Sequence, residues 1–346
     1  MKTDIKSMFL QELEDYFKSI GQQKFRAKQV FSWIHSGTST FDEMTDLSLE
    51  LREKLDNDFY ITKPELVKKQ VSEKDGTVKY LWRVQDDNDF IESVHMQYNH
   101  GDTICISTQV GCKMGCTFCA SSLDGFKRNL AASEMLDQIL FTQQDTGKRI
   151  SNVVLMGIGE PLDNFENVMK LIRLINHPSG LNIGARHLTL STCGIVENID
   201  KLAQYDVQLT LAISLHAPDD ETRSRLIPLN RQTGISKLIE SSEKYFKKTG
   251  RRITYEYALI NEVNDTAEHA KKLSKLLQST SGHLNLIYLS HVKDREFKPS
   301  SPENSGLFTE VLRANKMNFT IRRSLGSDIE ASCGQLRRRA KQASDK

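Results

Sequence analysis

Two kinds of hydrophobic pattern follow each other in the first hundred residues. Apolar residues recur at three- and four-residue spacing in segments 8–21, 25–37 and 48–59, which is the period of an amphipathic helix. β-Branched and aromatic residues then alternate with polar ones in KPELVKKQVS, TVKYLWRV and FIESVHMQY, with Asp-Gly or an Asp/Asn cluster at the breaks. The pattern predicts three helices followed by a small antiparallel sheet.

From residue 102 onward, short apolar runs alternate with longer helical segments such as 132–144 and 267–278. The predicted strands are TICIST, NVVLMG, HLTLST, VQLTLAIS, ITYEYAL, LNLIYLS and NFTIRR. This alternation predicts an α/β fold, with a parallel sheet or barrel covered by helices. Ligands of such folds bind beyond the carboxyl ends of the strands, so the chemistry is expected just after the apolar runs.

Composition and charge exclude several classes of protein. The 346 residues exceed the roughly 100–200 residues of a typical domain, which predicts a large α/β domain with an appendage, or two domains. Forty-seven Lys and Arg against 45 Asp and Glu give a net charge of +2, which is ordinary for a globular chain. We find neither a membrane-spanning apolar run nor the apolar core of a signal peptide, so we expect a cytoplasmic protein.

Three of the six cysteines, Cys112, Cys116 and Cys119, follow the first strand of the α/β region with the spacing C-x3-C-x2-C. Three thiolates on one short loop match three irons of a cubane cluster and leave the fourth iron open. Zinc is the main alternative metal, but a structural zinc site needs a fourth ligand. Three inert buried thiols would need a core that so short a loop does not provide.

This spacing, with Phe118 just before the last cysteine, resembles the signature of the radical S-adenosylmethionine superfamily. The resemblance implies a partial (β/α)6 barrel and a [4Fe-4S] cluster ligated by Cys112, Cys116 and Cys119. It also implies that the open iron chelates the methionine part of S-adenosyl-L-methionine, which one electron cleaves to a 5′-deoxyadenosyl radical.

Small or polar residues at the ends of later strands are candidates for contacts with this cofactor. Glycines let a ligand approach the backbone, and a carboxylate accepts hydrogen bonds from an ammonium group, although each residue alone also fits an ordinary turn. Their segments, MGIGEPL, LSTCG and ISLHA, resemble the RlmN/Cfr family of RNA methyltransferases, in which the matching positions contact the cofactor. These positions are Gly159, Glu160, Ser191, Ser214, Leu215 and His216.

The resemblance to this family runs almost from end to end, from FRAKQVFSWI to DIEASCGQL. It implies an RNA-contacting accessory region at 1–95, the barrel at 96–325 and a C-terminal segment at 326–346. The chain departs from the family at Cys193, where a small hydroxyl residue is usual, and at Ser290, where Asn is usual. We expect Cys193 to be a small buried hydrophobic residue and leave the role of Ser290 open.

Cys105 and Cys333 would be inert thiols if judged alone. The resemblance implies that Cys333 accepts a methyl group from one S-adenosylmethionine, and that its methylene radical, formed with a second, joins an adenine carbon. Cys105 then matches the cysteine that resolves this protein–RNA adduct through a Cys105–Cys333 disulfide. Glu92 matches the proposed general base, although its local pattern is also that of a solvent-facing residue on an alternating strand.

The implied reaction is methylation of carbon 2 of an adenosine in the peptidyl transferase centre of 23S rRNA, and of the adenosine next to the anticodon in tRNAs. Carbon 8 of the same rRNA adenosine is the sister alternative, although FRAKQVFSWIH, NIGARH and DIEASCGQL look closer to the carbon 2 branch. A zinc-stabilised RNA-binding module without catalysis and a radical enzyme with a small-molecule substrate are further alternatives. The implied partners are RNA and an electron donor such as flavodoxin or ferredoxin, with the protein a monomer.

Basic segments at 126–128, 247–252, 322–323 and 337–341 are either ordinary solvated surface or part of a phosphate-binding face.

Overall fold

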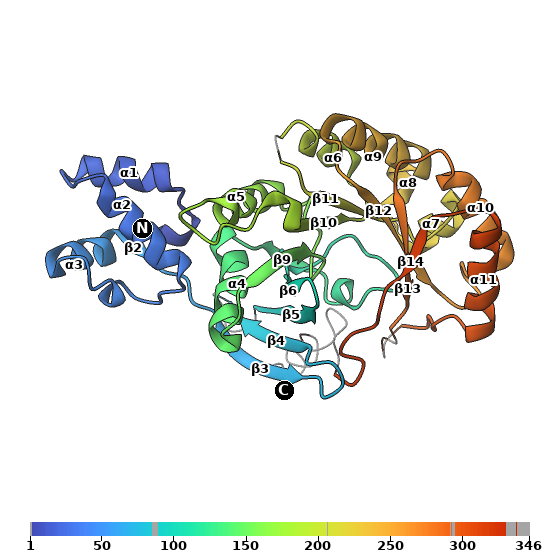
Figure 1. Ribbon diagram of the computed structural model, residues 1–346, viewed down its shortest axis with the longest axis horizontal. Helices are drawn as coiled ribbons and strands as arrows, with labels where there is room; N and C mark the ends of the chain where they lie inside the picture. Colours follow the sequence, from blue (N-terminus) through green and yellow to red (C-terminus); the bar gives the residue numbers. More distant parts are fainter. Residues whose placement is uncertain are drawn as a thin grey trace.

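The computed structural model describes residues 2–84, 89–205, 207–290, 292, 295–329 and 337. In these residues the central element is a ten-stranded sheet, shown in Figure 1. Its strands in spatial order are β14 (Phe319–Ile321), β13 (His283–Tyr288), β12 (Ile253–Leu259), β11 (Thr210–Ser214), β10 (Leu188–Thr192), β9 (Ile150–Leu155), β6 (Gly101–Cys105), β5 (Phe90–Tyr98), β4 (Val78–Arg83) and β3 (Glu65–Val71).

The part of the sheet from β6 to β14 is parallel and forms the predicted partial barrel. A helical segment follows each of its strands up to β13. These helices are α4 (Ala132–Thr146), α5 (Phe165–Asn176), α6 (Val196–Leu202), α7 (Asp220–Leu226), α8 (Asn230–Thr233), α9 (Ile235–Thr249), α10 (Ala267–Leu277) and α11 (Pro302–Ala314). The strand–helix alternation predicted from the sequence is confirmed. Among the described residues, no helix is long and apolar enough to cross a membrane.

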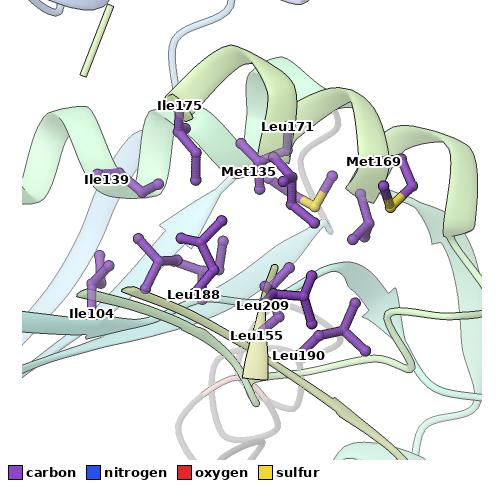
Figure 2. Packing of buried hydrophobic residues seen from close by; sticks show 14 of the residues in the cluster. Ile104, Met135, Ile139, Leu155, Met169, Leu171, Ile175, Leu188, Leu190 and Leu209 are labelled. Carbon is purple, nitrogen blue, oxygen red and sulfur yellow. The ribbon is translucent and has the colours of Figure 1, made fainter. Parts of the chain in front are cut away.

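The core of the barrel lies between the strands and the outer helices. Figure 2 shows Met135 and Ile139 of α4 above Ile104 of β6 and Leu188 of β10. Because successive side chains of a strand point to opposite faces, burying these residues outward turns residues such as Thr103, Asn152 and Ser191 inward. The inside of the barrel is therefore polar at many positions.

The N-terminal region contains the three predicted helices, α1 (Leu10–Ser19), α2 (Phe25–His35) and α3 (Leu49–Asp58). A short parallel pair, β1 (Thr3–Asp4) and β2 (Phe59–Tyr60), brings its two ends together. Figure 1 shows these helices beside α4 and α5, far from α10 and α11. A fully buried ion pair anchors them, because Lys6 Nζ lies 2.6 Å from Asp137 Oδ1 of α4.

The predicted antiparallel strands β3, β4 and β5 form as expected but do not make a sheet of their own. β5 pairs antiparallel with β6, with Val94 opposite Cys105, so the three strands extend the barrel sheet. The boundary predicted at residue 95 falls within β5. As domain limits, 1–95, 96–325 and 326–346 remain predictions.

Candidate active site

The three spaced cysteines lie on a loop between β6 and α4, at the carboxyl edge of the barrel. The loop is enclosed by a two-stranded ribbon, β7 (Gln109–Gly111) and β8 (Phe126–Asn129). Gly111 has φ +81° and packs so closely on Gly125 that a Cβ there would overlap the Gly125 carbonyl oxygen. All three thiols are half-buried. The ribbon therefore holds the loop that carries the three cysteines at the carboxyl edge of the barrel.

The chemistry of these thiols fits a cationic ligand. Burial, and then the neighbouring Cys119, raise the pKa of Cys112 to about 12, and the same causes raise the pKa of Cys116 strongly. A bound metal centre reverses this effect and holds thiols as thiolates. In the described part of the chain, no three His, Cys, Asp or Glu side chains are already gathered as metal ligands. The fit to an iron–sulfur cluster rests on donor type, spacing and the shared loop.

Arg295, which belongs to no recognisable sequence motif, contacts the outer side of this loop. Its Nη2 donates to the carbonyl oxygen of Cys119 and to Ser122 Oγ, both at 2.9 Å. The same nitrogen lies 3.3 Å from the carbonyl oxygen of Cys116. The guanidinium therefore fixes the backbone of two cluster cysteines and places a positive charge beside them.

Gly159 and Glu160 follow β9 and lie against the start of the cysteine loop. Gly159 has φ +110°, and a Cβ there would lie 2.7 Å from Gln109 Cβ. The Glu160 carboxylate is buried and accepts hydrogen bonds from the amides of Cys193, at 2.8 Å, and Leu162, at 3.0 Å. Burial raises the pKa of Glu160, whereas these hydrogen bonds lower it.

Arg223 of α7 is a second functional candidate that no pattern in the sequence indicated. It is 1% exposed and donates to the carbonyl oxygens of Cys193 (2.6 Å), Ser214 (3.1 Å) and Leu215 (3.2 Å). Arg223 therefore ties the ends of β10 and β11 together. Cys193 is buried, as predicted, with its amide bonded to Glu160 and its carbonyl to Arg223.

The candidate residues on β10 and β11 come together inside the barrel. Ser191 Oγ and Ser214 Oγ lie 3.4 Å apart. Leu215 is fully buried, and its amide donates to the carbonyl oxygen of Glu256. Both backbone polar groups of Leu215 have protein partners, so the serine hydroxyls are the more available groups for a ligand.

His216 lies where the barrel meets the cysteine loop. Its φ is +55°, and its ring packs edge-on against Phe118, with 5.0 Å between ring centroids. The Ala258 amide donates to His216 Nδ1 at 3.0 Å, which leaves the ring proton on Nε2. Burial, and then Arg223, lower the pKa of His216 to about 3. The imidazole is therefore neutral at pH 7.

A buried carboxylate inside the barrel was also missed. Glu256 on β12 lies next to Ser214 in the strand register. Its Oε1 accepts a hydrogen bond from Asn285 Nδ2 at 2.9 Å, whereas its Oε2 is buried and has no partner among the described residues. A buried, unpaired carboxylate oxygen is costly, so it is available to a ligand with hydroxyl or amine donors.

A cavity of about 350 Å³ opens beside these groups and brings together three predicted site residues and Ser290, whose role the sequence left open. Cys105, Cys119, His216 and Ser290 all line it. The wall around Cys105 is apolar and contains Val94 and Met96 of β5. The structure thus places the predicted resolving cysteine beside the cluster loop, whereas in the sequence Cys105 merely precedes it.

Glu92 is not the solvent-facing residue that its local pattern allowed. It is 3% exposed, and its Oε2 lies 2.9 Å from Lys79 Nζ in an ion pair that is buried on both sides. The backbone amide of Arg337 donates to Glu92 Oε1 at 2.6 Å. Cys333 itself lies outside the described residues, and so does its proposed disulfide with Cys105.

Described residues on both sides of Cys333 contact the antiparallel strands. Ser72 Oγ, next to β3, donates to Asp328 Oδ1 at 2.6 Å, while Arg337 contacts Glu92 on β5. Both flanks of the predicted methyl acceptor therefore lie along the part of the sheet that carries Glu92.

Comparison with known proteins agrees with this architecture. Residues 3–61 match the family model of the ribosomal RNA large subunit methyltransferase N-terminal domain, and residues 106–273 match that of the radical SAM superfamily. The second match contradicts the alternative of a non-catalytic zinc module.

Relatives and one solved structure match over nearly the whole chain. A probable dual-specificity RNA methyltransferase RlmN of Alkaliphilus oremlandii is 51% identical over 98% of both chains. One of Lachnoclostridium phytofermentans is 48% identical over 97% of this chain and 95% of its own. The crystal structure of a radical SAM methyltransferase from Sphaerobacter thermophilus is 40% identical, covers 96% of this chain and 98% of its own, and superposes with a TM-score of 0.91.

Proposed function

Because this chain belongs to the RlmN family of radical S-adenosylmethionine enzymes, we propose that it methylates carbon 2 of adenosines in RNA. The proposed substrates are the peptidyl transferase centre of 23S rRNA and the adenosine next to the anticodon in tRNAs. Its cofactors are a [4Fe-4S] cluster and S-adenosylmethionine. The observation that carries the proposal is the position of Cys105 in one cavity with Cys119 and His216.

The cofactors would be held by groups on the cysteine loop and inside the barrel. Cys112, Cys116 and Cys119 would ligate the cluster, which when bound supplies the electron that cleaves S-adenosylmethionine to a 5′-deoxyadenosyl radical. Glu160 and the backbone at Gly159 would bind the methionine part. The rest of the cofactor would be bound by Ser191, Ser214, Leu215 and His216, and by the Glu256 oxygen that has no partner among the described residues.

Two cysteines and a carboxylate carry out the covalent steps. The Cys333 sulfur first takes a methyl group by displacement, and S-adenosylhomocysteine leaves. This methyl would lose a hydrogen atom to the 5′-deoxyadenosyl radical, which becomes 5′-deoxyadenosine. The methylene carbon left on the Cys333 sulfur would then bond the adenine carbon, and the resulting radical adduct would lose one electron to the oxidised cluster. Glu92 then takes the proton from that adenine carbon.

Release follows when the Cys105 thiolate attacks the Cys333 sulfur. The sulfur–methylene bond breaks, its electron pair stays on the methylene carbon, and that carbon gains a proton to become the methyl group of the product. The resulting Cys105–Cys333 disulfide is reduced by a thiol or an electron donor before the next turnover.

The partners proposed for this activity are 23S rRNA, tRNA and a small electron-transfer protein such as flavodoxin or ferredoxin. The site of action would be the cytoplasm, and the protein would work as a monomer.

Anaerobic turnover with ribosomal RNA and S-adenosylmethionine tests the reaction. We expect S-adenosylhomocysteine and 5′-deoxyadenosine to form together, and mass spectrometry of the digested RNA to find 2-methyladenosine. Finding 8-methyladenosine instead would overturn the proposed position of methylation.

Two cysteine variants test the roles of the thiols. Cys333→Ala is expected to abolish methyl transfer while its iron content stays that of the wild type. Cys105→Ala is expected to accumulate protein–RNA adduct, seen as a shifted band on a denaturing gel. Cys193→Ser, which introduces the residue type usual in the family, is the control and should form product. Free RNA alone in the Cys105→Ala reaction would overturn the resolving role.

A further inference from the structure

A second cavity continues from the active-site cavity toward the amino ends of the parallel strands, where residues that point into the barrel, such as Thr103 and Asn152, form part of its lining. It has a volume of about 250 Å³, and Met96, Tyr98 and Arg322 line both cavities. His100, Arg186 and His187 lie farther along the second cavity. Together the two cavities form one groove, which begins at the cluster loop and ends at exposed side chains; we call it the flank groove.

The side chains with a formal charge that line the flank groove are all positive among the described residues. Its lining includes Arg186, Arg322 and Arg323, all exposed, and no aspartate or glutamate among the described residues. Acidic residues are almost as numerous as basic ones in the whole chain, 45 against 47. A lining of this extent without any acid is therefore a local feature, and it favours a polyanionic ligand.

The arginines of the groove are not neutralised by neighbouring carboxylates. Arg186 donates to Gln208 Oε1 at 3.1 Å, and Arg322 contacts the sulfur of Met156 at 3.7 Å. Among the described residues, neither guanidinium forms an ion pair with an aspartate or glutamate. Both can therefore pair with phosphates without breaking a salt bridge.

An aromatic surface lies beside these charges. The rings of Tyr98 and His100, at the turn between β5 and β6, are stacked with centroids 5.1 Å apart and an interplanar angle of 19°. Tyr98 is half-buried and His100 exposed, so the pair offers a ring face next to the groove. Flat aromatic side chains beside arginines are typical of sites that stack unpaired bases.

We propose that the flank groove binds the unpaired nucleotides next to the target adenosine. A neighbouring base stacks on the Tyr98–His100 pair, and the adjoining phosphates contact Arg186 and Arg322. The target base itself enters the active-site cavity, because a base on which an enzyme acts must leave its stack to reach the reactive groups. This inference rests on the proposed RNA methyltransferase function and specifies single-stranded RNA as what the groove recognises.

The test compares binding of two RNA probes to the reconstituted full-length enzyme by fluorescence anisotropy. One probe is a short single strand from the target loop, and the other is the same sequence in a blunt duplex. We expect Tyr98→Ala to weaken binding of the single strand roughly 5- to 150-fold, the effect of losing one stacked base, and to leave duplex binding nearly unchanged. Tyr98→Phe, which keeps the ring, should restore single-strand binding.

Two further variants separate the groove from general surface charge. Arg186→Ala should lower the slope of log K against log salt by about 0.7 for the single strand, as expected for one lost phosphate contact. Lys271→Ala removes an equal charge from the exposed face of α10, outside the groove, and should behave as wild type. Equal losses in Arg186→Ala and Lys271→Ala, or unchanged binding in Tyr98→Ala, would overturn the inference.

Failure of the inference differs from failure of the proposed function. If the wild type methylates the RNA and the groove variants bind and methylate RNA equally well, the groove inference is wrong and the proposed function stands. If the wild type forms no methylated adenosine on any RNA while still cleaving S-adenosylmethionine, the proposed function is wrong, and the groove inference falls with it.

Discussion

At the scale of single residues, the site depends on backbone positions that allow only glycine. Gly159 has φ +110°, a conformation that side chains with a Cβ rarely adopt, and it packs against Gln109. Gln109 Oε1 in turn accepts a hydrogen bond from the amide of Glu160 at 2.9 Å. A movement of the backbone at Gly159 would therefore displace Glu160, whose carboxylate is proposed to bind the cofactor.

Gly159→Ala is expected to weaken binding of S-adenosylmethionine and to cost roughly 1–3 kcal/mol of stability through backbone strain. The matched control is Gly147→Ala, since Gly147 also has a positive φ, +65°, but a Cβ there would have no atom within 4 Å. The control should lose about 1 kcal/mol and bind the cofactor normally. Equilibrium dialysis and urea unfolding measure both quantities, and equal cofactor affinity in the two variants would contradict the prediction.

The sequence could place the residues that follow strands but not those that reach the site from elsewhere. Glu160, Ser191 and His216 were predictable as candidates because each lies at or shortly beyond the end of an apolar run. Arg223 was not, because DETRSRL has the composition of an exposed helix, and its burial comes from carbonyl groups at the ends of β10 and β11. Glu92 was similarly ambiguous, because its partner Lys79 lies on another strand.

At the scale of elements, period-two alternation located β3, β4 and β5 but did not reveal their neighbours. Alternation reports one buried and one exposed face, whereas β4 is buried at nearly every position. The pairing of β5 with β6 depends on backbone hydrogen bonds, and the pattern of polar and apolar side chains does not indicate which strands these bonds join. This explains why the strands were predicted and their union with the barrel sheet was not.

Removing only one partner of the Lys79–Glu92 ion pair between β4 and β5 should destabilise the protein strongly. Lys79→Met is expected to lower the free energy of unfolding by roughly 3–5 kcal/mol, because it leaves a buried carboxylate without this cation. Lys79→Met combined with Glu92→Leu should recover much of that loss. Lys69→Met, which removes the partly exposed pair with Asp145, should cost only about 0–1 kcal/mol. Urea unfolding measures all three, and a small loss in Lys79→Met alone would contradict the assignment.

At the scale of the whole molecule, a buried histidine lies where the N-terminal helices meet the barrel. His35 Nδ1 contacts the carbonyl oxygen of Phe31 at 2.9 Å, and its Nε2 is buried without a partner among the described residues. Gly180, beyond α5, packs so closely on the ring that a Cβ would lie 2.8 Å from it. Burial lowers the pKa of His35 from 6.5 to about 4.

Because the unfolded chain binds this proton more tightly than the folded one, stability should fall as the pH is lowered. The contribution of His35 is complete above pH 6.5 and is lost as the pH falls toward 4. Its size is roughly 2–4 kcal/mol. His35→Leu should lose correspondingly less stability over this window, although His216 leaves some dependence in the same direction. Urea midpoints at both ends of the window provide the measurement, and identical pH dependence in the two proteins would contradict it.

The union of β5 with β6 also limits how such enzymes can be recombined. β6 ends at Cys105 and is bonded to β9 on one side and to β5 on the other. A chimera joined at residue 96 would build β5 from two parents, and a poorly matched pairing with β6 would leave edge backbone groups exposed, which invites aggregation. A junction between β2 and β3 would instead exchange the N-terminal helices as a unit and keep every strand of the large sheet with its native neighbours.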